Sequence, residues 1–274
     1  MVEKKPPRER RPIITLTTDF GTRDHYVGVM KGVILGRFAD ARIVDLAHDI
    51  PAQWPPEAGF WVSRSYRWFP AGTVHLAIVD PGVGTERDIL LVQHDRHYFM
   101  APDNGLLAPI LGVSGDTQVF KLDLSCFRRL GLGDPSATFH GRDIFAPIAA
   151  DIASGRTNPV SVGLPAYEWI PGWIDEPEVS TGKVSGVIIT VDTFGNLISN
   201  IDRSLLDNFR EPVAHIAGHQ IHMLTTYGRA RPGEYLALVN SFDVVEIARA
   251  EGNAAEGLGS ERGAPIVITD GVSI

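Results

Sequence analysis

Runs of apolar, β-branched residues that end at an acidic residue recur in the first half of the chain. The run 12–18 (PIITLTT) is followed by Asp19, and the run 73–79 (TVHLAIV) is followed by Asp80. Apolar runs of this length, bounded by turn residues, are typical of buried strands. The pattern therefore predicts two buried strands, each with a carboxylate just beyond its carboxyl end.

Two segments between these predicted strands have the apolar periodicity of a helix. Apolar and small residues recur at the spacing of one helix face over 26–35, and a second helix is predicted over 57–66, after two prolines. The segment 41–46 has the pattern of a further strand, and 89–93 with 97–100 has that of a hairpin. Strands that alternate with helices indicate an α/β sheet, whose ligands lie at the carboxyl ends of its strands.

The pattern changes near residue 156. Prolines interrupt any regular structure over 159–180, and short apolar runs separated by turns follow. Short strands of this kind are typical of a small β-barrel or sandwich. We therefore expect an N-terminal α/β domain over 12–158, a Pro-rich linker over 159–180 and a C-terminal β-barrel domain over 181–274.

The first residues, 1–11, are basic and rich in proline, and we expect them to form a disordered arm. They lack the apolar core of a signal peptide. No run of 18 or more apolar residues, as a membrane-spanning helix requires, occurs in the chain. We expect a cytoplasmic protein without a membrane partner.

Composition narrows the function classes. The 274 residues include 25 Lys and Arg against 33 Asp and Glu, so the net charge of −8 argues against a general nucleic-acid binder. Hydrophobic residues make up 44 %, which is enough for a sizeable core. The single cysteine, Cys126, excludes an intrachain disulfide and a zinc site built from cysteines.

Five aspartates stand in turns beside glycine or aromatic residues. One aspartate after a strand is most often a turn former or a helix cap. Several together indicate a site that holds hydroxyl groups or cations. The five are Asp19, Asp24, Asp80, Asp143 and Asp192.

Other motifs carry weaker signals. Gly82 and Gly84 lack the third glycine of a dinucleotide loop and the Gly-Lys-Ser/Thr of a P-loop. His215, His219 and His222 are spaced like metal ligands. In a strand and turn, however, these side chains would not share a face, which favours a surface or packing role.

Six motifs, taken in their order along the chain, resemble one family, the S-adenosyl-L-methionine hydroxide adenosyltransferases. This family is related to the fluorinase and chlorinase enzymes, and the resemblance covers about residues 12–260. The motifs are 18–21 (TDFG), 79–85 (VDPGVGT) with Arg87, 101–106 (APDNGL), 139–143 (FHGRD), 192–196 (DTFGN), and 240–241 (NS) with 246–248 (EIA) and 252–255 (GNAA).

The resemblance implies hydrolysis of S-adenosyl-L-methionine to adenosine and L-methionine, with water attacking the ribose C5′ as the sulfonium leaves. It assigns activation of the water to Asp80, Arg87 and His140. Water, with a pKa of about 15.7, must be oriented and must lose a proton as it attacks. His140 titrates near neutrality, Asp80 can accept a hydrogen bond, and Arg87 stays charged. The thioether leaves as a neutral group, so neither a general acid, a metal nor a cofactor is expected.

The resemblance also implies a set of substrate-binding residues. Asp19 would accept hydrogen bonds from the ribose hydroxyls, Asn196 would pair with the adenine edge, and Phe194 would stack on the base. The methionine half would be held through its amino group and its carboxylate, and further residues fall where relatives hold the nucleoside. These residues are Asp192 for the amino group, Ser241 for the carboxylate, Glu246 and the backbone of Arg249 for the nucleoside, and Asp24 at the amino-acid end.

Five of these residues also have an ordinary structural interpretation. His140 could cap the helix that begins near residue 143, Arg87 could be a solvated hairpin charge, and Asp80 could shape the turn before a proline. Phe194 could pack in a core and Asn196 could complete a β-turn. The motif order favours the functional interpretation.

The resemblance further implies the assembly and the partners. In relatives an N-terminal α/β/α sandwich domain precedes a small β-barrel, and three subunits form a homotrimer with active sites between the first domain of one subunit and the second of its neighbour. The implied partners are the substrate S-adenosyl-L-methionine and the product adenosine, with no nucleic acid and no membrane.

Three features favour a hydrolase over a halogenase. Asp80 and His140 stand where the halogenating relatives have tyrosines, and the stretch between Arg87 and Asn104 lacks the long insertion of the fluorinase. Gly141 replaces the serine associated with fluoride binding, although the chlorinase also has a glycine there. A carboxylate at position 80 would repel a halide anion.

Two further hypotheses stay open. One is a sensor that binds S-adenosyl-L-methionine or adenosine without turnover, and the other is a metal-dependent hydrolase that a chelator would inactivate. The loop at Gln53 and Trp54 departs from the family pattern, so the lid of the pocket is expected to differ.

Overall fold

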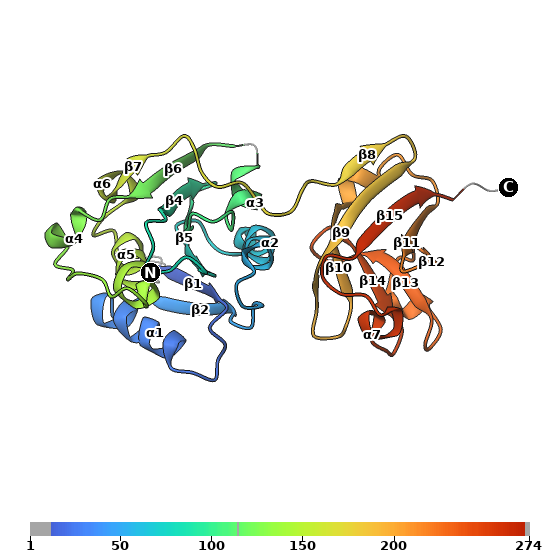
Figure 1. Cartoon of the computed structure of the whole chain (residues 1–274), viewed down its shortest axis with the longest axis horizontal. Helices are drawn as coiled ribbons and strands as arrows, with labels where there is room; N and C mark the ends of the chain where they lie inside the picture. The colour runs from blue at the N-terminus through green and yellow to red at the C-terminus, as the bar shows by residue number, and fades with distance from the viewer. Residues whose placement is uncertain (1–11, 114, 272–274) are drawn as a thin grey trace, which may run out of the picture. The chain divides into compact units, whose positions relative to one another are not determined.

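The structure is a computed structural model that describes residues 12–113 and 115–271, so the expected arm over 1–11 lies outside the described residues. The chain divides into two compact units, Met1–Trp173 and Ile174–Ile274 (Figure 1). No helix in the described ranges is long and apolar enough to cross a membrane.

Unit 1 is built on a seven-stranded sheet with the order β2-β1-β3-β5-β4-β6-β7. The neighbours from β2 to β5 are parallel, and β4, β6 and β7 are added in antiparallel pairs. The strands are β1 (Ile13–Thr18), β2 (Arg42–Ala47), β3 (Val74–Ile78), β4 (Ile89–His94), β5 (His97–Pro102), β6 (Thr117–Leu122) and β7 (Gly163–Pro165).

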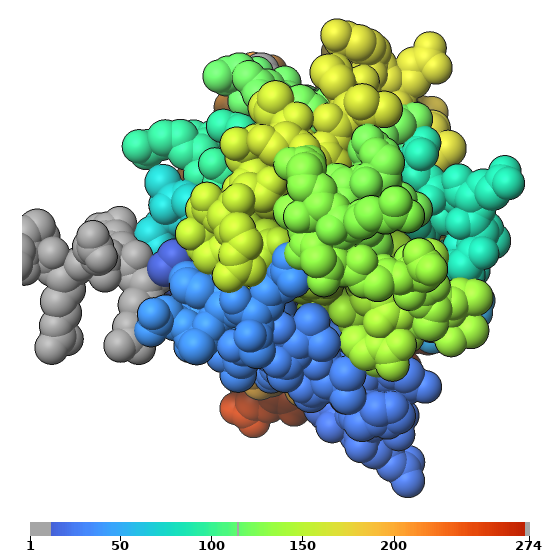
Figure 2. All heavy atoms as spheres, turned by 90° about the vertical axis from the view of Figure 1, so that its left-hand side faces the viewer, coloured from blue at the N-terminus to red at the C-terminus, as the bar shows by residue number. Residues whose placement is uncertain are grey.

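Helices cover both faces of this sheet, as the nearly continuous apolar pattern of β1 and β3 requires. Ile14 and Leu16 of β1 pack with helices α1 (Tyr26–Arg37) and α5 (Ala146–Ala153). The other face packs against α2 (Pro55–Ser65) and α3 (Ala108–Leu111). In Figure 2, which views the first face, the blue surface of α1 borders the yellow-green surface around α5. Unit 1 is therefore an α/β/α sandwich.

Short helical segments complete unit 1. They are 3-10 helix Tyr66–Trp68, α4 (Cys126–Arg129), the π-helical turn Gly141–Phe145 and α6 (Pro159–Val162).

Part of the segment expected as a linker is regular structure that belongs to unit 1. Asn158 caps α6 by accepting a hydrogen bond from the Ser161 amide, and Pro159 occupies the first turn, where its missing N–H costs nothing. The strand β7 then pairs with β6 at the sheet edge, a position that tolerates Pro165. Residues 166–177 form neither helix nor strand.

Unit 2 is an eight-stranded, antiparallel, nearly closed barrel. Its main path runs β12-β11-β15-β9-β10-β14-β13, with β8 paired to β9, and a bridge between Met223 and Ala237 brings the two ends together. The strands are β8 (Glu178–Ser180), β9 (Lys183–Val191), β10 (Leu197–Asp202), β11 (Pro212–Ile216), β12 (His219–His222), β13 (Tyr235–Val239), β14 (Val244–Arg249) and β15 (Pro265–Asp270).

Inward-facing aliphatic side chains such as Ile188, Ala214 and Ile266 fill the interior of this barrel. Helix α7 (Ala254–Leu258) and the 3-10 helices Arg203–Leu206 and Tyr227–Arg229 connect its strands. The expected class, an α/β domain followed by a small β-barrel, is confirmed.

Candidate active site

Asp80, Arg87 and His140 come together in unit 1. Asp80 follows the end of β3, Arg87 precedes β4, and His140 precedes the π-helical turn. The Arg87 Nε lies 2.9 Å from Oδ1 and 3.0 Å from Oδ2 of Asp80, and its Nη2 also pairs with Oδ2. The same Nη2 lies 3.0 Å from the His140 Nδ1. Only 11 % of the Arg87 side chain and 5 % of the Asp80 side chain are exposed, so this is a shielded cluster.

The contact with Arg87 determines the tautomer of His140. A guanidinium can only donate, so the His140 Nδ1 must accept, and the ring proton of the neutral imidazole then resides on Nε2. Burial lowers the pKa of His140, and the positive charge of Arg87 lowers it further. The cluster thus holds a neutral imidazole whose Nε2–H is a donor.

The segment that carries His140 is itself fixed by an ion pair. Arg142 donates from Nε to Asp143 Oδ1 at 2.6 Å, and the Ser136 amide donates to Asp143 Oδ2 at 2.9 Å. The Arg142 guanidinium lowers the pKa of Asp143 to about 2, and the hydrogen bonds from Ser136 also lower it. Asp143 therefore braces the turn rather than joining the cluster of Asp80.

Asp19 lies at the same end of the sheet as Asp80, because β1 and β3 are parallel neighbours with Thr18 opposite Ile78. The amide of Gln53 donates to Asp19 Oδ2 at 3.1 Å. Burial raises the pKa of Asp19, and the charge of Asp80 adds to this, against the hydrogen bond from Gln53. The loop that departs from the family pattern therefore contacts Asp19. Asp24 lies exposed in the segment before α1.

The motif 192–196 forms a tight turn between β9 and β10 in unit 2. Asp192 Oδ1 accepts from the amides of Phe194 and Asn196, each at 2.9 Å, and its Oδ2 accepts from Asn196 Nδ2 at 3.0 Å. Gly195 has a φ of +83°, and a Cβ there would overlap the side chain of Asn253. The Phe194 side chain, 79 % exposed, does not pack in a core, so its ring is available for stacking.

A buried carboxylate lies on β14 of the same unit. Glu246 accepts from the Tyr227 hydroxyl at 2.6 Å and from Asn240 Nδ2 at 3.1 Å. Burial raises the pKa of Glu246, an effect that these two hydrogen bonds oppose and the charge of Asp192 reinforces. The sequence analysis missed Tyr227, since no motif or periodicity distinguishes it, and gave no role to Asn240.

The remaining predicted residues of unit 2 are less enclosed. Ser241 lies exposed between β13 and β14. Arg249, at the end of β14, donates from Nε to the Gly233 carbonyl at 3.1 Å, with its guanidinium 5.4 Å from the centre of the Tyr235 ring.

The histidines with the spacing of metal ligands have other partners. His215 bonds to Thr269 Oγ1 at 2.8 Å, and His219 lies against Tyr235. Within the described ranges, no group of three or more His, Cys, Asp and Glu side chains could hold a metal ion.

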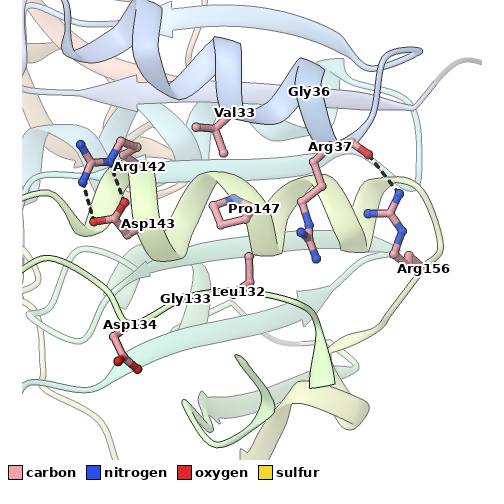
Figure 3. A pocket seen from close by; sticks show the side chains of 10 residues that line it. All are labelled: Val33, Gly36, Arg37, Leu132, Gly133, Asp134, Arg142, Asp143, Pro147 and Arg156. Carbon is pink, nitrogen blue, oxygen red and sulfur yellow. Dashed lines mark hydrogen bonds and ion pairs between the residues drawn. The ribbon is translucent and has the colours of Figure 1, made fainter. Parts of the chain in front are cut away.

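A groove of about 650 Å³ opens beside α1 and α5 in unit 1 (Figure 3). Arg142 and Asp143 line it, but Asp80, Arg87 and His140 do not. Arg142 pairs with Asp143, and the other two arginines of the groove pair with the fully buried Asp151. Arg37 and Arg156 share the single carboxylate of Asp151, and Asp134, which also lines the groove, supplies a further negative charge.

Comparison with known proteins gives a consistent family. A family model described as the SAM hydroxide adenosyltransferase N-terminal domain matches residues 14–163, and the model of the corresponding C-terminal domain matches residues 186–267. Together they span most of both units.

Several curated relatives match over nearly their full length. An (R)-S-adenosyl-L-methionine hydrolase of Thermus thermophilus is 34 % identical, with 93 % of this chain and 98 % of the relative covered. One from Salinispora tropica is also 34 % identical, with 95 % and 98 % covered. A fluorinase of Actinopolyspora mzabensis is 24 % identical, with 94 % and 97 % covered.

Among solved structures, an uncharacterized conserved protein from Thermotoga maritima superposes with a TM-score of 0.84 at 33 % identity. The match covers 93 % of this chain and 99 % of that one.

Proposed function

Because the chain belongs to the SAM hydroxide adenosyltransferase family, we propose that it is an enzyme that hydrolyses S-adenosyl-L-methionine to adenosine and L-methionine. The observation that carries this proposal is the shielded cluster of Asp80, Arg87 and His140. A protein that only binds its ligand has no need of a carboxylate and an imidazole joined through one arginine. The hydrolases among the relatives are also more similar to this chain than the fluorinases are.

The proposed reaction needs one proton acceptor and no acid. The water oxygen bonds to C5′, the C5′–S bond breaks, and its electron pair stays on the sulfur of methionine. The geometry supports Asp80 as the acceptor of the water proton, since a carboxylate paired with one arginine keeps lone pairs free. It supports His140 as a donor that orients the water through Nε2–H, because its Nδ1 already accepts from Arg87.

Substrate binding is proposed on the residues of both units. Oδ1 of Asp19 is available to accept hydrogen bonds from the ribose hydroxyls, because the Gln53 amide donates only to Oδ2. The exposed ring of Phe194 suits stacking on adenine. The side-chain amide of Asn196 donates one of its two N–H groups to Asp192, which leaves the second N–H and the oxygen for the adenine edge. The other proposed substrate-binding residues are Asp24, Asp192, Ser241, Glu246 and Arg249.

A cytoplasmic homotrimer that works without a cofactor or metal also belongs to this proposal. The family resemblance supports the trimer, and the single cysteine, which is typical of a reducing compartment, supports the location. The chemistry supports the rest, since a neutral thioether needs no Lewis acid to leave.

The test is chromatography of the products formed from S-adenosyl-L-methionine, with and without chloride and with a chelator. Adenosine and methionine in equal amounts, unaffected by either addition, would support the proposal. The matched variant Asp80→Asn should form neither, because an amide oxygen is too weak a base. A 5′-chloro product would identify a halogenase, loss of activity with chelator would identify a metal enzyme, and ligand retention without turnover would identify a sensor.

A further inference from the structure

The motif 101–106 supplies no residue to the proposed reaction, yet it holds the strand end that carries Asp80. The side chain of Asn104 donates from Nδ2 to the carbonyl of Val79 at 2.8 Å, and its Oδ1 accepts from the Leu106 amide at 3.2 Å. Val79 immediately precedes Asp80. The amide side chain thus connects the turn after β5 to the peptide that leads into the proposed proton acceptor.

The Val79 carbonyl needs this partner because it lies beyond the regular sheet. Strand β3 ends at Ile78, and its register with β5 ends where Leu76 faces Met100. Val79 is fully buried, so its carbonyl has no access to water and must be satisfied within the protein. Asn104 therefore fixes the orientation of the last peptide before Asp80.

The same turn holds the last residues of unit 1. The backbone carbonyl of Asn104 accepts from the Trp173 indole N–H at 2.8 Å, and Asp103 Oδ1 accepts from the Ile170 amide at 2.8 Å. Gly105 has a φ of +86°, and a Cβ on it would overlap the carbonyl of Pro171. Segment 170–173 is therefore seated directly on the turn.

The contacts continue from Trp173 toward Asp19. The Trp173 ring packs edge-on against Trp54, with ring centres 5.8 Å apart. Trp54 follows Gln53, whose amide holds Asp19. One chain of contacts therefore connects the carbonyl before Asp80, through Asn104 and Trp173, to the loop that binds Asp19.

We propose that Asn104 is a positioning residue that sets the orientation of Asp80 through the Val79 carbonyl, and that Trp173 holds Asn104 in place from the other side. The effect on turnover rests on the proposed hydrolase function. The effect on the geometry of Asp80 does not.

The decisive variant is Asn104→Asp, which keeps the acceptor for the Leu106 amide but loses the donor to Val79. Displacement of a reacting group by about 1 Å can lower a rate about a hundredfold, so we expect kcat to fall at least about tenfold. The KM and the affinity for adenosine should stay within about twofold, since Asp80 acts on water rather than on the nucleoside. The matched control is Asn158→Asp, at an exposed helix cap where the side chain acts only as an acceptor, and it should behave as the wild type.

A spectroscopic measurement tests the geometry without turnover. The Arg87 Nε–H, bonded to Asp80, should give a slowly exchanging ¹⁵N-coupled proton signal, assigned by its loss in Arg87→Lys. We expect this signal to shift or exchange faster in Asn104→Asp, and to a smaller extent in Trp173→Phe, which removes the N–H but keeps a ring against Trp54. If Asn104→Asp does not fold, Asn104→Ala is tested in the same way.

An unchanged Arg87 signal together with unchanged kcat in Asn104→Asp would overturn the inference. So would a kcat that falls only in step with the midpoint of thermal unfolding, because Asn104 would then serve the turn alone. If the wild type forms no adenosine, the hydrolase proposal fails, while the Arg87 signal still decides the role of Asn104.

Discussion

At the scale of single residues, Arg87 connects a carboxylate and an imidazole that lie far apart in the sequence. Its Nη2 contacts both Asp80, 7 positions away along the chain, and His140, 53 positions away. A guanidinium fork can face two partners at once, whereas an ammonium group is a point charge. The hydrogen-bond direction that follows for His140 is the basis of two predictions.

The first prediction concerns the donor role of His140. In His140→Gln the amide oxygen can accept from Arg87 and the amide N–H can donate to water, whereas His140→Ala offers neither. We expect the kcat of His140→Gln to be at least about tenfold higher than that of His140→Ala. Initial rates of adenosine formation measure this, with thermal unfolding as the control for folding. Equal losses in the two variants would mean that His140 acts as a base.

The second prediction concerns pH. Protonation of the His140 Nδ1 would place an N–H donor opposite the Nη2 donor of Arg87, and the hydrogen bond between them would be lost. Only the neutral ring therefore keeps the cluster intact. Because burial and Arg87 lower the pKa of His140 from 6.5, activity should be constant near neutrality and fall with pH only below 6.5. In His140→Gln the part of this acid limb that comes from the imidazole should be lost. A pH–rate profile of kcat/KM would contradict the account if the wild-type limb lay above 6.5.

At the scale of elements, the sequence predicted correctly those strands and helices whose structure is determined by their own local segment. The hairpin of β4 and β5 follows from two apolar runs around Asp95 and Arg96, and both turn residues have the positive φ that a tight hairpin needs. The short strands β7 and β8 were not predicted, because three residues carry no periodicity and their strand pairing depends on a neighbour.

For the candidate site, likewise, the sequence predicted the residues but not the contacts between them. Motif order named Asp80, Arg87 and His140, but no local pattern could show that one arginine joins the other two. Nor could it show that Asn196 is bonded to Asp192, or that Asn104 reaches Val79. These contacts depend on how distant segments pack, which a single sequence does not encode locally.

A buried histidine on β3 gives a prediction for the stability of unit 1. His75 bonds through Nδ1 to Thr15 Oγ1 at 2.9 Å and through Nε2 to His97 at 3.2 Å. Burial, and then His97, lower the pKa of His75 to about 3, against 6.5 in an unfolded chain. The unfolded state therefore binds the extra proton below pH 6.5. The contribution of His75 to stability should be fully present above that pH. Between pH 6.5 and 3 the free energy of unfolding should fall by up to about 1.4 kcal/mol per pH unit.

Urea unfolding at pH 7, 6 and 5 measures this dependence. His75→Gln should show a shallower fall in the free energy of unfolding than the wild type, whatever its stability at pH 7. The matched control, His219→Gln at an exposed position, should keep the wild-type slope. An identical slope in His75→Gln would mean that other groups cause the acid sensitivity.

At the scale of the whole molecule, the residues proposed for the reaction and for the nucleoside are shared between the two units. Asp80, Arg87, His140 and Asp19 belong to unit 1, whereas Phe194, Asn196 and Glu246 belong to unit 2. Neither unit alone carries the full proposed set. We therefore expect either unit, expressed alone, to be inactive.

The proposed trimer gives a mass in solution. Light scattering after size exclusion should give about 90 kDa, three times the 29.9 kDa of the chain, and the value should persist on dilution through the assay range. Full activity from a species of single-chain mass would contradict the trimer while leaving the hydrolase proposal intact.

In the proposed reaction, water attacks the ribose C5′ with Asp80 as its proton acceptor. The most direct measurement is mass spectrometry of the adenosine formed in ¹⁸O-labelled water. We expect one heavy oxygen, at the 5′ position, in adenosine from the wild type, and no labelled product from Asp80→Asn. Unlabelled adenosine, or equal labelling by Asp80→Asn at the wild-type rate, would contradict it.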